Sequence, residues 1–195
     1  MTDLIDTLVG IDVGSPLDAL RAKRPVARSD AQTTYDALIT DPGDLARASA
    51  VERAAIAFWV AALSRAEQLA ANYRGLLADL DPAVATSIDD ALPDATTTGP
   101  YGTYPAGPLS AEDEAGLHFT ASPALRDAVG TRLAAALEHA HLLTFRPRDA
   151  SPDALQALLE AGWSTDGIVT VSQLVAFIHF QLRVITGLTV LKKAI

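Results

Sequence analysis

The sequence predicts an all-α fold. Of its 195 residues, 49% are hydrophobic and 20% are charged, which is sufficient for one domain with a proper apolar core. Aromatic residues make up only 6%, and alanine and leucine dominate the apolar set. Because alanine loses no side-chain entropy in a helix, this composition favours helices over strands. We therefore expect a single helical domain over residues 1–195.

A capping box marks the first clear helix start. Ser49 and Glu52 match the S-x-x-E pattern directly ahead of the apolar run 54–63, so a helix should begin at Ser49. No proline follows until Pro82. The segment is therefore expected to be one long helix, or two helices with a break near Ser64.

Three later helices have similar start signals. Ser122-Pro123 and Ser151-Pro152 each place a capping serine before a proline, whose missing N–H is harmless at the first helical position. The last and longest apolar helix should open around residues 164–166 and continue past Arg183, with Gly187 as its weak point.

Two apolar stretches raise the question of a membrane. Residues 54–63 are too few to cross about 30 Å of hydrocarbon. Residues 174–185 contain His179, Gln181 and Arg183, and charge near the middle of a membrane span is costly. Both stretches are interpreted as buried core helices, and no membrane partner is expected.

The segment 92–116 differs in kind from the rest of the chain. Its four prolines and four glycines predict irregular structure. Loops of this length in a compact domain are uncommon and tend to be lids, binding loops or arms that embrace another subunit, with disorder as the alternative. Because tyrosines and a leucine recur in it, an ordered role is favoured.

Charge and cysteine content limit the function classes. The formal net charge is -9, with no block of basic residues, so nucleic acid is not an expected partner. The acidic N-terminal residues lack the basic-then-apolar order of a secretory signal, and zero cysteines exclude a disulfide framework. These features predict a cytoplasmic protein that performs no reaction needing a thiol of its own.

Motifs for metals, nucleotides and serine nucleophiles are absent. The sequence has no G-x-S-x-G, G-x-x-x-x-G-K-[ST] or G-x-G-x-x-G pattern. His139 and His141 are the one close histidine pair, but residues two apart on a helix point about 200° away from each other. We therefore expect no metal and no cofactor, with one of these histidines in the core or an interface and the other solvated.

The last helix carries a narrow polar stripe. Ser172, His179, Arg183 and Thr186 fall within roughly 60° of one another on an otherwise apolar helix. Because such helices are usually buried, the stripe should line a cavity or a subunit contact, with a solvent-facing strip as the alternative. A buried Arg183 would need Glu52, Glu67 or a small anionic ligand as its partner.

Residues 52–63, 157–169 and 173–177 together resemble the carboxymuconolactone decarboxylase and alkylhydroperoxidase D superfamily. The resemblance covers roughly residues 30–190 and is strongest in the C-terminal third. It implies a helical bundle of the alkylhydroperoxidase D-like type. It also implies a homo-oligomer, which agrees with a mean hydropathy of +0.20, more apolar than one small core needs.

The peroxidase branch of this family has a glutamate followed by Cys-x-x-Cys-x-x-x-His. In this chain the corresponding positions are Ala54 for the glutamate, Ala66 and Leu69 for the cysteines, and Tyr73 for the histidine. Thiol peroxidase activity needs a thiolate, so it is not expected here. The decarboxylase branch lacks the cysteines but has a histidine where this chain has Asn72, which cannot shuttle a proton near neutral pH.

Two phrases, residues 101–109 and 145–152, resemble a cysteine-less subgroup of the family. That resemblance implies a cysteine-bearing relative as a partner. The leading hypothesis is therefore a non-peroxidatic binding or partner subunit. The alternative is a cysteine-free lyase acting on a small carboxylated or lactone compound.

In the lyase hypothesis the last helix supplies the reacting groups. Arg183 would hold the carboxylate and His179 would move the proton. Both would face one cavity together with Asn72 and Tyr73, because the family builds its site between these two helices.

Overall fold

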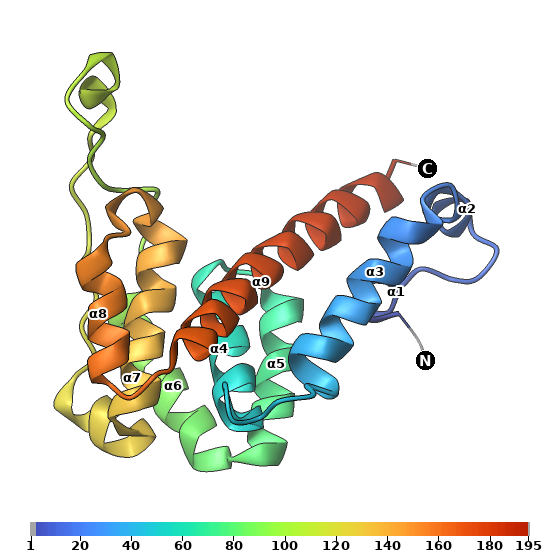
Figure 1. Ribbon diagram of the computed structural model, residues 1–195. Coiled ribbons are helices and arrows are strands. Elements are labelled where there is room, and N and C mark those ends of the chain that lie inside the picture. The colour runs from blue at the N-terminus through green and yellow to red at the C-terminus, as the bar shows by residue number, and fades with distance from the viewer. Residues whose placement is uncertain (1–2, 195) are drawn as a thin grey trace.

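The computed structural model describes residues 3–194, and within them it contains nine α-helices and no β-strand (Figure 1). The all-α prediction is confirmed. The helices are α1 (Leu4–Val9), α2 (Pro16–Ala22), α3 (Pro25–Tyr35), α4 (Ala50–Leu63), α5 (Glu67–Leu80), α6 (Pro82–Ala95), α7 (Pro123–Phe145), α8 (Pro152–Glu160) and α9 (Thr165–Lys192). Short turns of other helix types lie at Asp36–Thr40, Pro108–Glu112 and Pro147–Asp149.

Helix α4 is the centre of the core, with α5, α7 and α9 packed around it. Ten of its fourteen residues are buried. The Trp59 side chain is fully buried, and its indole N–H donates to the carbonyl of Leu137 on α7 at 3.0 Å. The expected capping box of Ser49 and Glu52 is present at the start of α4. Local chemistry therefore starts the helix, and burial of its whole circumference stabilises it.

The 49–80 segment is two helices with the break near Ser64, one of the two arrangements expected. Ser64 ends α4, and Arg65 has a left-handed φ of 56°. The chain reverses over these residues, so α5 packs back along α4. The Asp81 side chain then caps α6 by accepting from two backbone N–H groups.

Arg53 anchors the segment that precedes α4. Its side chain is buried and donates to three backbone carbonyls, those of Ala48 at 2.8 Å, Leu38 at 2.9 Å and Asp44 at 3.2 Å. Burial is the main cause that lowers the pKa of this guanidinium, although the group remains a cation. One side chain thus fixes the path of residues 38–48.

Helices α1 to α3 form a separate layer against the C-terminal half of α9 (Figure 1). Asp6 on α1 pairs with Arg21 on α2 and with Arg28 on α3. The Lys192 ammonium of α9 donates to the carbonyl of Val9 at 3.1 Å. Ion pairs therefore hold the three helices of this layer together, and the Lys192 contact joins the layer to α9.

The last three helices begin where their capping serines predict. Ser122, Ser151 and Ser164 each accept a backbone N–H in the first turn of α7, α8 and α9. The expected weak point at Gly187 is wrong, because α9 continues unbroken to Lys192. The sharp deviation lies instead in α7, where Gly130 has a φ of 81°. A glycine costs only about 1 kcal/mol in a helix, and packing on α1 and α2 offsets that cost in α9.

The irregular segment begins later than the sequence suggests. Helix α6 continues through Pro93 to Ala95. Pro93 lies in the last turn of α6, where its lost N–H removes a single hydrogen bond. Residues 96–116 then leave the body as an arm, which reaches upward beyond α7 and α8 in Figure 1, and residues 117–122 return to the body, where Phe119 packs on Trp59. Its two sides are joined by backbone hydrogen bonds between Gly102 and Glu114 and by one from the Tyr104 backbone N–H to the Asp113 carboxylate at 2.7 Å.

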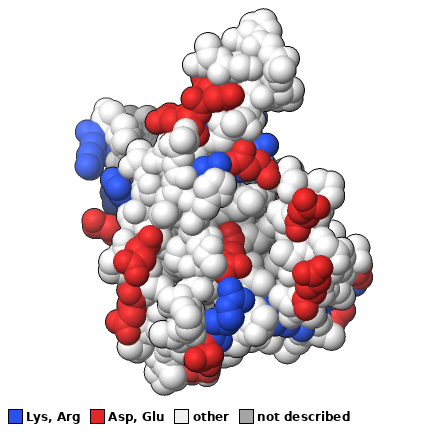
Figure 2. Space-filling model, turned by 90° about the vertical axis from the view of Figure 1, so that its left-hand side faces the viewer, with Lys and Arg blue, Asp and Glu red and all other residues white. Residues whose placement is uncertain are grey.

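The base of the arm is clamped by the chain that follows α7. Arg148 places its guanidinium 4.3 Å from the ring centre of Tyr104, and the Asp149 carboxylate accepts from the backbone N–H of Thr103 at 3.1 Å. Gly102 is needed beside this carboxylate, because a Cβ there would lie 2.7 Å from an Asp149 oxygen. The two phrases 101–109 and 145–152 are therefore partners in space. The arm tip, residues 105–111, carries no charge and forms the uncharged lobe at the top of Figure 2.

Helix α9 meets a test for membrane spans by length and composition. It has 28 residues, and its most apolar 18-residue window has a mean hydropathy of 1.7 and is 33% buried inside the protein. Core helices of soluble proteins pass the same test. Much of α9 is therefore exposed, although Phe180 also lines a groove with α2 and α3, and Val190 lines one with the start of α5.

Candidate functional site

The four residues that we aligned with the peroxidase motif lie on α4, on α5 and at the residue before α5, and two of them, Ala66 and Leu69, line a groove of about 270 Å³. Ala54, Leu69 and Tyr73 are between 0% and 1% exposed, and Ala66 is partly exposed just ahead of α5. None of the four residues carries a thiol, and Tyr73 alone among them can titrate.

Tyr73 makes one buried hydrogen bond that joins α5 to α9. Its hydroxyl donates to Oε1 of Gln181 at 2.6 Å, across 108 positions of sequence. Burial raises the pKa of Tyr73 well above 10, so the phenol stays protonated and neutral. The Tyr35 ring packs 6.4 Å away. Tyr73 and Gln181 therefore form a neutral, hydrogen-bonded pair in the core.

Asn72 lies beside Tyr35 at the edge of this cluster. Burial is the main cause that raises the pKa of the Tyr35 phenol, and a hydrogen bond from the Asn72 side chain acts in the opposite direction. Asn72 is half-buried. The Asn72 side chain therefore contacts the end of α3.

His179 and Arg183 have different neighbours. The Nε2 atom of His179 lies 3.4 Å from the Thr144 hydroxyl on α7, and Arg183 is exposed and donates to the carbonyl of His179 at 2.9 Å. Burial, followed by the charge of Arg183, lowers the pKa of His179. Because His179 precedes Gln181 by two residues, it points about 200° away from the side of α9 that meets Tyr73. The structure thus places the four expected catalytic residues in two different surroundings.

The expected partners of Arg183 are engaged elsewhere or exposed. Glu52 pairs with Arg132 at 3.0 Å, and Glu67 is exposed at the start of α5. Among residues 3–194, neither glutamate forms an ion pair with Arg183. Thr186, the last residue of the polar stripe, lines a separate groove of about 270 Å³ beside Ala66. The stripe is therefore not one continuous site.

A second stripe of α9 is exposed along the whole helix. It consists of eight residues spaced alternately three and four apart, which we call the α9 seam: Asp166, Val169, Gln173, Ala176, Phe180, Arg183, Gly187 and Val190. Val169, Phe180 and Val190 are 52%, 43% and 64% exposed. A strict repeat of this kind is the pattern by which one helix packs against another. Sequence analysis missed it because the buried faces of α9 are equally apolar.

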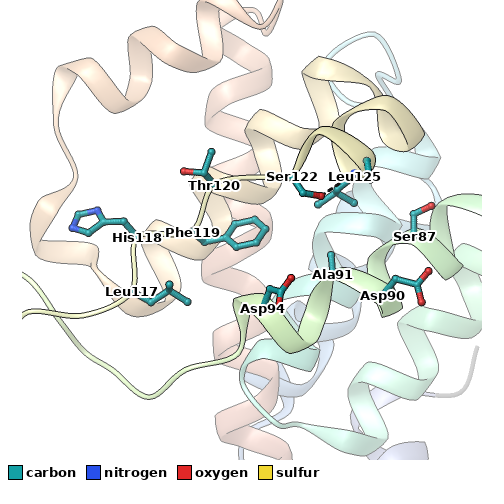
Figure 3. A pocket seen from close by; sticks show the side chains of 11 residues that line it. Ser87, Asp90, Ala91, Asp94, Leu117, His118, Phe119, Thr120, Ser122 and Leu125 are labelled. Carbon is teal, nitrogen blue, oxygen red and sulfur yellow. Dashed lines mark hydrogen bonds between the residues drawn. The ribbon is translucent and has the colours of Figure 1, made fainter.

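A cavity of about 590 Å³ lies between α6 and residues 117–125 (Figure 3). Asp90 and Asp94 lie one turn apart on α6 along one wall, and residues 117–120 form the other. His118 is directed away from Asp94 in this view. The same residue and Phe119 also line a smaller cavity on the far side of this segment.

That smaller cavity, which we call the histidine cavity, has a volume of about 180 Å³ and lies between α7, α8 and residues 118–119. Both His139 and His141 line it, and they are 6% and 1% exposed. The expectation that one of the pair is solvated is therefore wrong. The two rings do leave α7 in different directions, but α8 and the end of α6 cover both sides.

The two histidines differ in their hydrogen bonds. Nε2 of His141 is 3.0 Å from the carbonyl of Ala95, and since a carbonyl only accepts, Nε2 carries the proton. Neither ring nitrogen of His139 has a hydrogen-bond partner, although both are buried. Burial lowers the pKa of each ring, so both are neutral at pH 7.

The charged groups of the histidine cavity are already paired. Arg146 forms an ion pair with Asp149 and donates to the carbonyl of Gly116 at 3.0 Å, whereas its Nε is buried without a partner. Glu138 accepts from Arg126 at 2.7 Å and from the backbone N–H of Ala121. In the part of the chain that the structure describes, no three histidine, aspartate or glutamate side chains group as metal ligands.

Sequence analysis did not single out Gln181, His118 or Arg146 as functional residues. Gln181 could have been flagged as a polar residue within the most apolar helix, since such a residue requires a partner. No local signal identifies His118 or Arg146, because their roles depend on how the arm folds back on α7.

Comparisons of the chain with protein-family models, with curated proteins and with solved structures find no match. The functional argument therefore depends on the geometry of these surfaces and cavities.

Proposed function

We propose that this protein is a non-peroxidatic binding subunit of the alkylhydroperoxidase D-like type, located in the cytoplasm, which assembles with a second copy of itself through the α9 seam. The observation that carries the proposal is the exposed seam itself. The replacement of the peroxidase positions by Ala66, Leu69 and the Tyr73–Gln181 bond supports the non-peroxidatic part.

The seam is self-complementary when two α9 helices run antiparallel. With the two-fold axis between Leu174 and Val175, residues at equal distance on either side meet. Asp166 then faces Arg183, Val169 faces Phe180 and Gln173 faces Ala176, each twice across the axis. An acid meets a base and two large apolar side chains meet, which is what a stable isologous contact needs.

The charges of the seam favour a protein partner over lipid. Asp166 at present lies 3.6 Å from Arg47 and is 68% exposed, so its carboxylate is accessible to a second cation. Arg183 and Gln173 interrupt the apolar seam, and such groups are costly in hydrocarbon. A membrane surface and a cysteine-bearing relative are the competing occupants, and the experiment distinguishes them.

Sedimentation equilibrium of the purified chain tests the proposal. We expect a dimer or a multiple of it at micromolar concentration, and Phe180→Glu should shift the mass to the 20.4 kDa monomer. Asp166→Arg and Arg183→Asp should each weaken association, whereas the double variant should restore it because the pair is only reversed. Val26→Glu, at an exposed residue of α3, is the control for an added surface charge.

The outcome decides between the occupants. Rescue by the double charge reversal supports the antiparallel pairing, since no other register brings these two residues together. A monomer that floats with lipid vesicles would instead assign the seam to a membrane. A monomer that binds neither itself nor lipid, but binds a cysteine-bearing relative, would replace self-assembly by a mixed complex.

A further inference from the structure

We propose that the histidine cavity binds a short-chain carboxylate, which His139 and Arg146 hold by hydrogen bonds, and that one proton is taken up with it. The inference is independent of the α9 seam. It assigns a ligand class to a cavity that none of the peroxidase-like positions lines.

The first step concerns the hydrogen bonds that His139 lacks. An imidazole that is 6% exposed with neither nitrogen partnered loses its hydration without compensation. Buried polar groups in folded proteins are almost always satisfied, by protein, water or ligand. His139 lines a cavity, so a molecule in that cavity can supply the missing partners.

The second step is the sign of the ligand's charge. Five ionisable side chains line the cavity, and four of them are bases: His118, His139, His141 and Arg146. The one acid, Glu138, already accepts from Arg126 and Ala121. Helix α8 contributes no ionisable side chain to the lining. The free groups are therefore donors, the Nε of Arg146 and an N–H of His139, which suit an anion.

The third step is the proton. The charges of Arg146 and Glu138 are balanced by Asp149 and Arg126, and burial favours the neutral forms of His139 and His141. A carboxylate would bring an unbalanced negative charge into a buried space, which is costly. Protonation of His139 removes that imbalance and gives the ring a second donor. Binding should therefore be coupled to the uptake of one proton.

The fourth step is size and polarity. A volume of about 180 Å³ equals that of about six water molecules. One side of the cavity is apolar, formed by Leu142, Leu158 and the ring of Phe119 with three alanines. A short hydrocarbon chain can lie against this side while its carboxylate meets the donors. Bulky acids exceed the volume of the cavity, and acids with several charges do not match its apolar side.

Isothermal titration calorimetry of the full chain with butyrate, butyramide and butylamine tests the proposal. We expect saturable binding of butyrate that weakens about tenfold for each unit of pH between 7 and 8.5, the slope of one-proton uptake. Titration in two buffers of different ionisation enthalpy should also give one proton taken up for each butyrate bound. Butyramide should bind at least tenfold more weakly and without the pH dependence.

Two variants separate the site from general effects. His139→Leu keeps the side-chain volume and should weaken butyrate binding at least tenfold, and Ala157→Phe should do the same by filling the cavity from α8. His179→Gln changes a histidine outside the cavity and should leave binding unchanged. Retained binding in a folded His139→Leu protein, equal binding of butylamine, or no butyrate binding by the wild-type chain would overturn the proposal.

Discussion

The Arg53 guanidinium is a single group on which the path of residues 38–48 depends, so its removal gives a quantitative test. Arg53→Met keeps an unbranched side chain but deletes all three hydrogen bonds to backbone carbonyls. Hydrogen bonds from a charged donor contribute about 1.5–3 kcal/mol each. The Leu38 and Asp44 carbonyls are partly accessible and can regain water, which offsets part of the loss.

The expected result is a loss of about 3–5 kcal/mol in the free energy of unfolding, a large share of the 5–15 kcal/mol typical of a domain. Urea unfolding followed by circular dichroism measures it. The loss for Arg53→Lys should lie between zero and the loss for Arg53→Met, because one ammonium group cannot reach all three carbonyls as the guanidinium does.

Arg47→Met is the matched control. Arg47 is 50% exposed and pairs with Asp44 at 3.0 Å, so its loss should cost less than about 1 kcal/mol. If Arg53→Met also costs less than about 1 kcal/mol, the three carbonyls are not held by this side chain in solution and the anchoring argument fails.

Four further predictions concern other parts of the chain. His139→Leu should raise stability by about 1 kcal/mol at pH 7.5, because it removes two unsatisfied nitrogens, and thermal unfolding will show a lower melting temperature if that reasoning fails. Burial lowers the pKa of His139 and His141 in the folded protein. The free energy of unfolding is therefore highest above about pH 6.5 and decreases as pH falls through the folded pKa, and His139→Leu should make this decrease smaller. Tyr73→Phe should cost about 1–3 kcal/mol by leaving Gln181 without its donor, whereas Tyr35→Phe should cost less, and equal losses would contradict the special role of that bond. The purified chain, with a reduced dithiol as electron donor, should not consume alkyl hydroperoxide above the buffer rate, and turnover that persists after contaminating peroxidases are removed would refute this.

Features set by neighbouring residues could be predicted from the sequence. The helix starts at Ser49, Ser122, Ser151 and Ser164 depend on a side chain that caps the next turn, so a few residues contain the whole cause. The all-α class follows from the residue composition and needs no knowledge of contacts between distant residues. The continuity of α9 at Gly187 was missed because packing by distant helices outweighs the propensity of one glycine.

The candidate sites depend on contacts between distant residues. Tyr73 meets Gln181 across 108 positions, and periodicity places Tyr73 in the core without identifying its partner. His139 and His141 are both buried because α8 and the end of α6 cover opposite sides of α7, which no local pattern encodes. The α9 seam was in the sequence, but only the exposed fractions separate it from the buried faces of the same helix.

Arg146 belongs to two places at once. Its guanidinium lines the histidine cavity, donates to Gly116 in the arm and pairs with the Asp149 carboxylate that holds Thr103. Because the two places share one guanidinium, binding at one of them changes the binding free energy at the other, and the effect is equal in both directions. A partner that grips the uncharged arm tip and moves the base would alter the affinity of the cavity, and an occupied cavity would alter the affinity for that partner to the same degree.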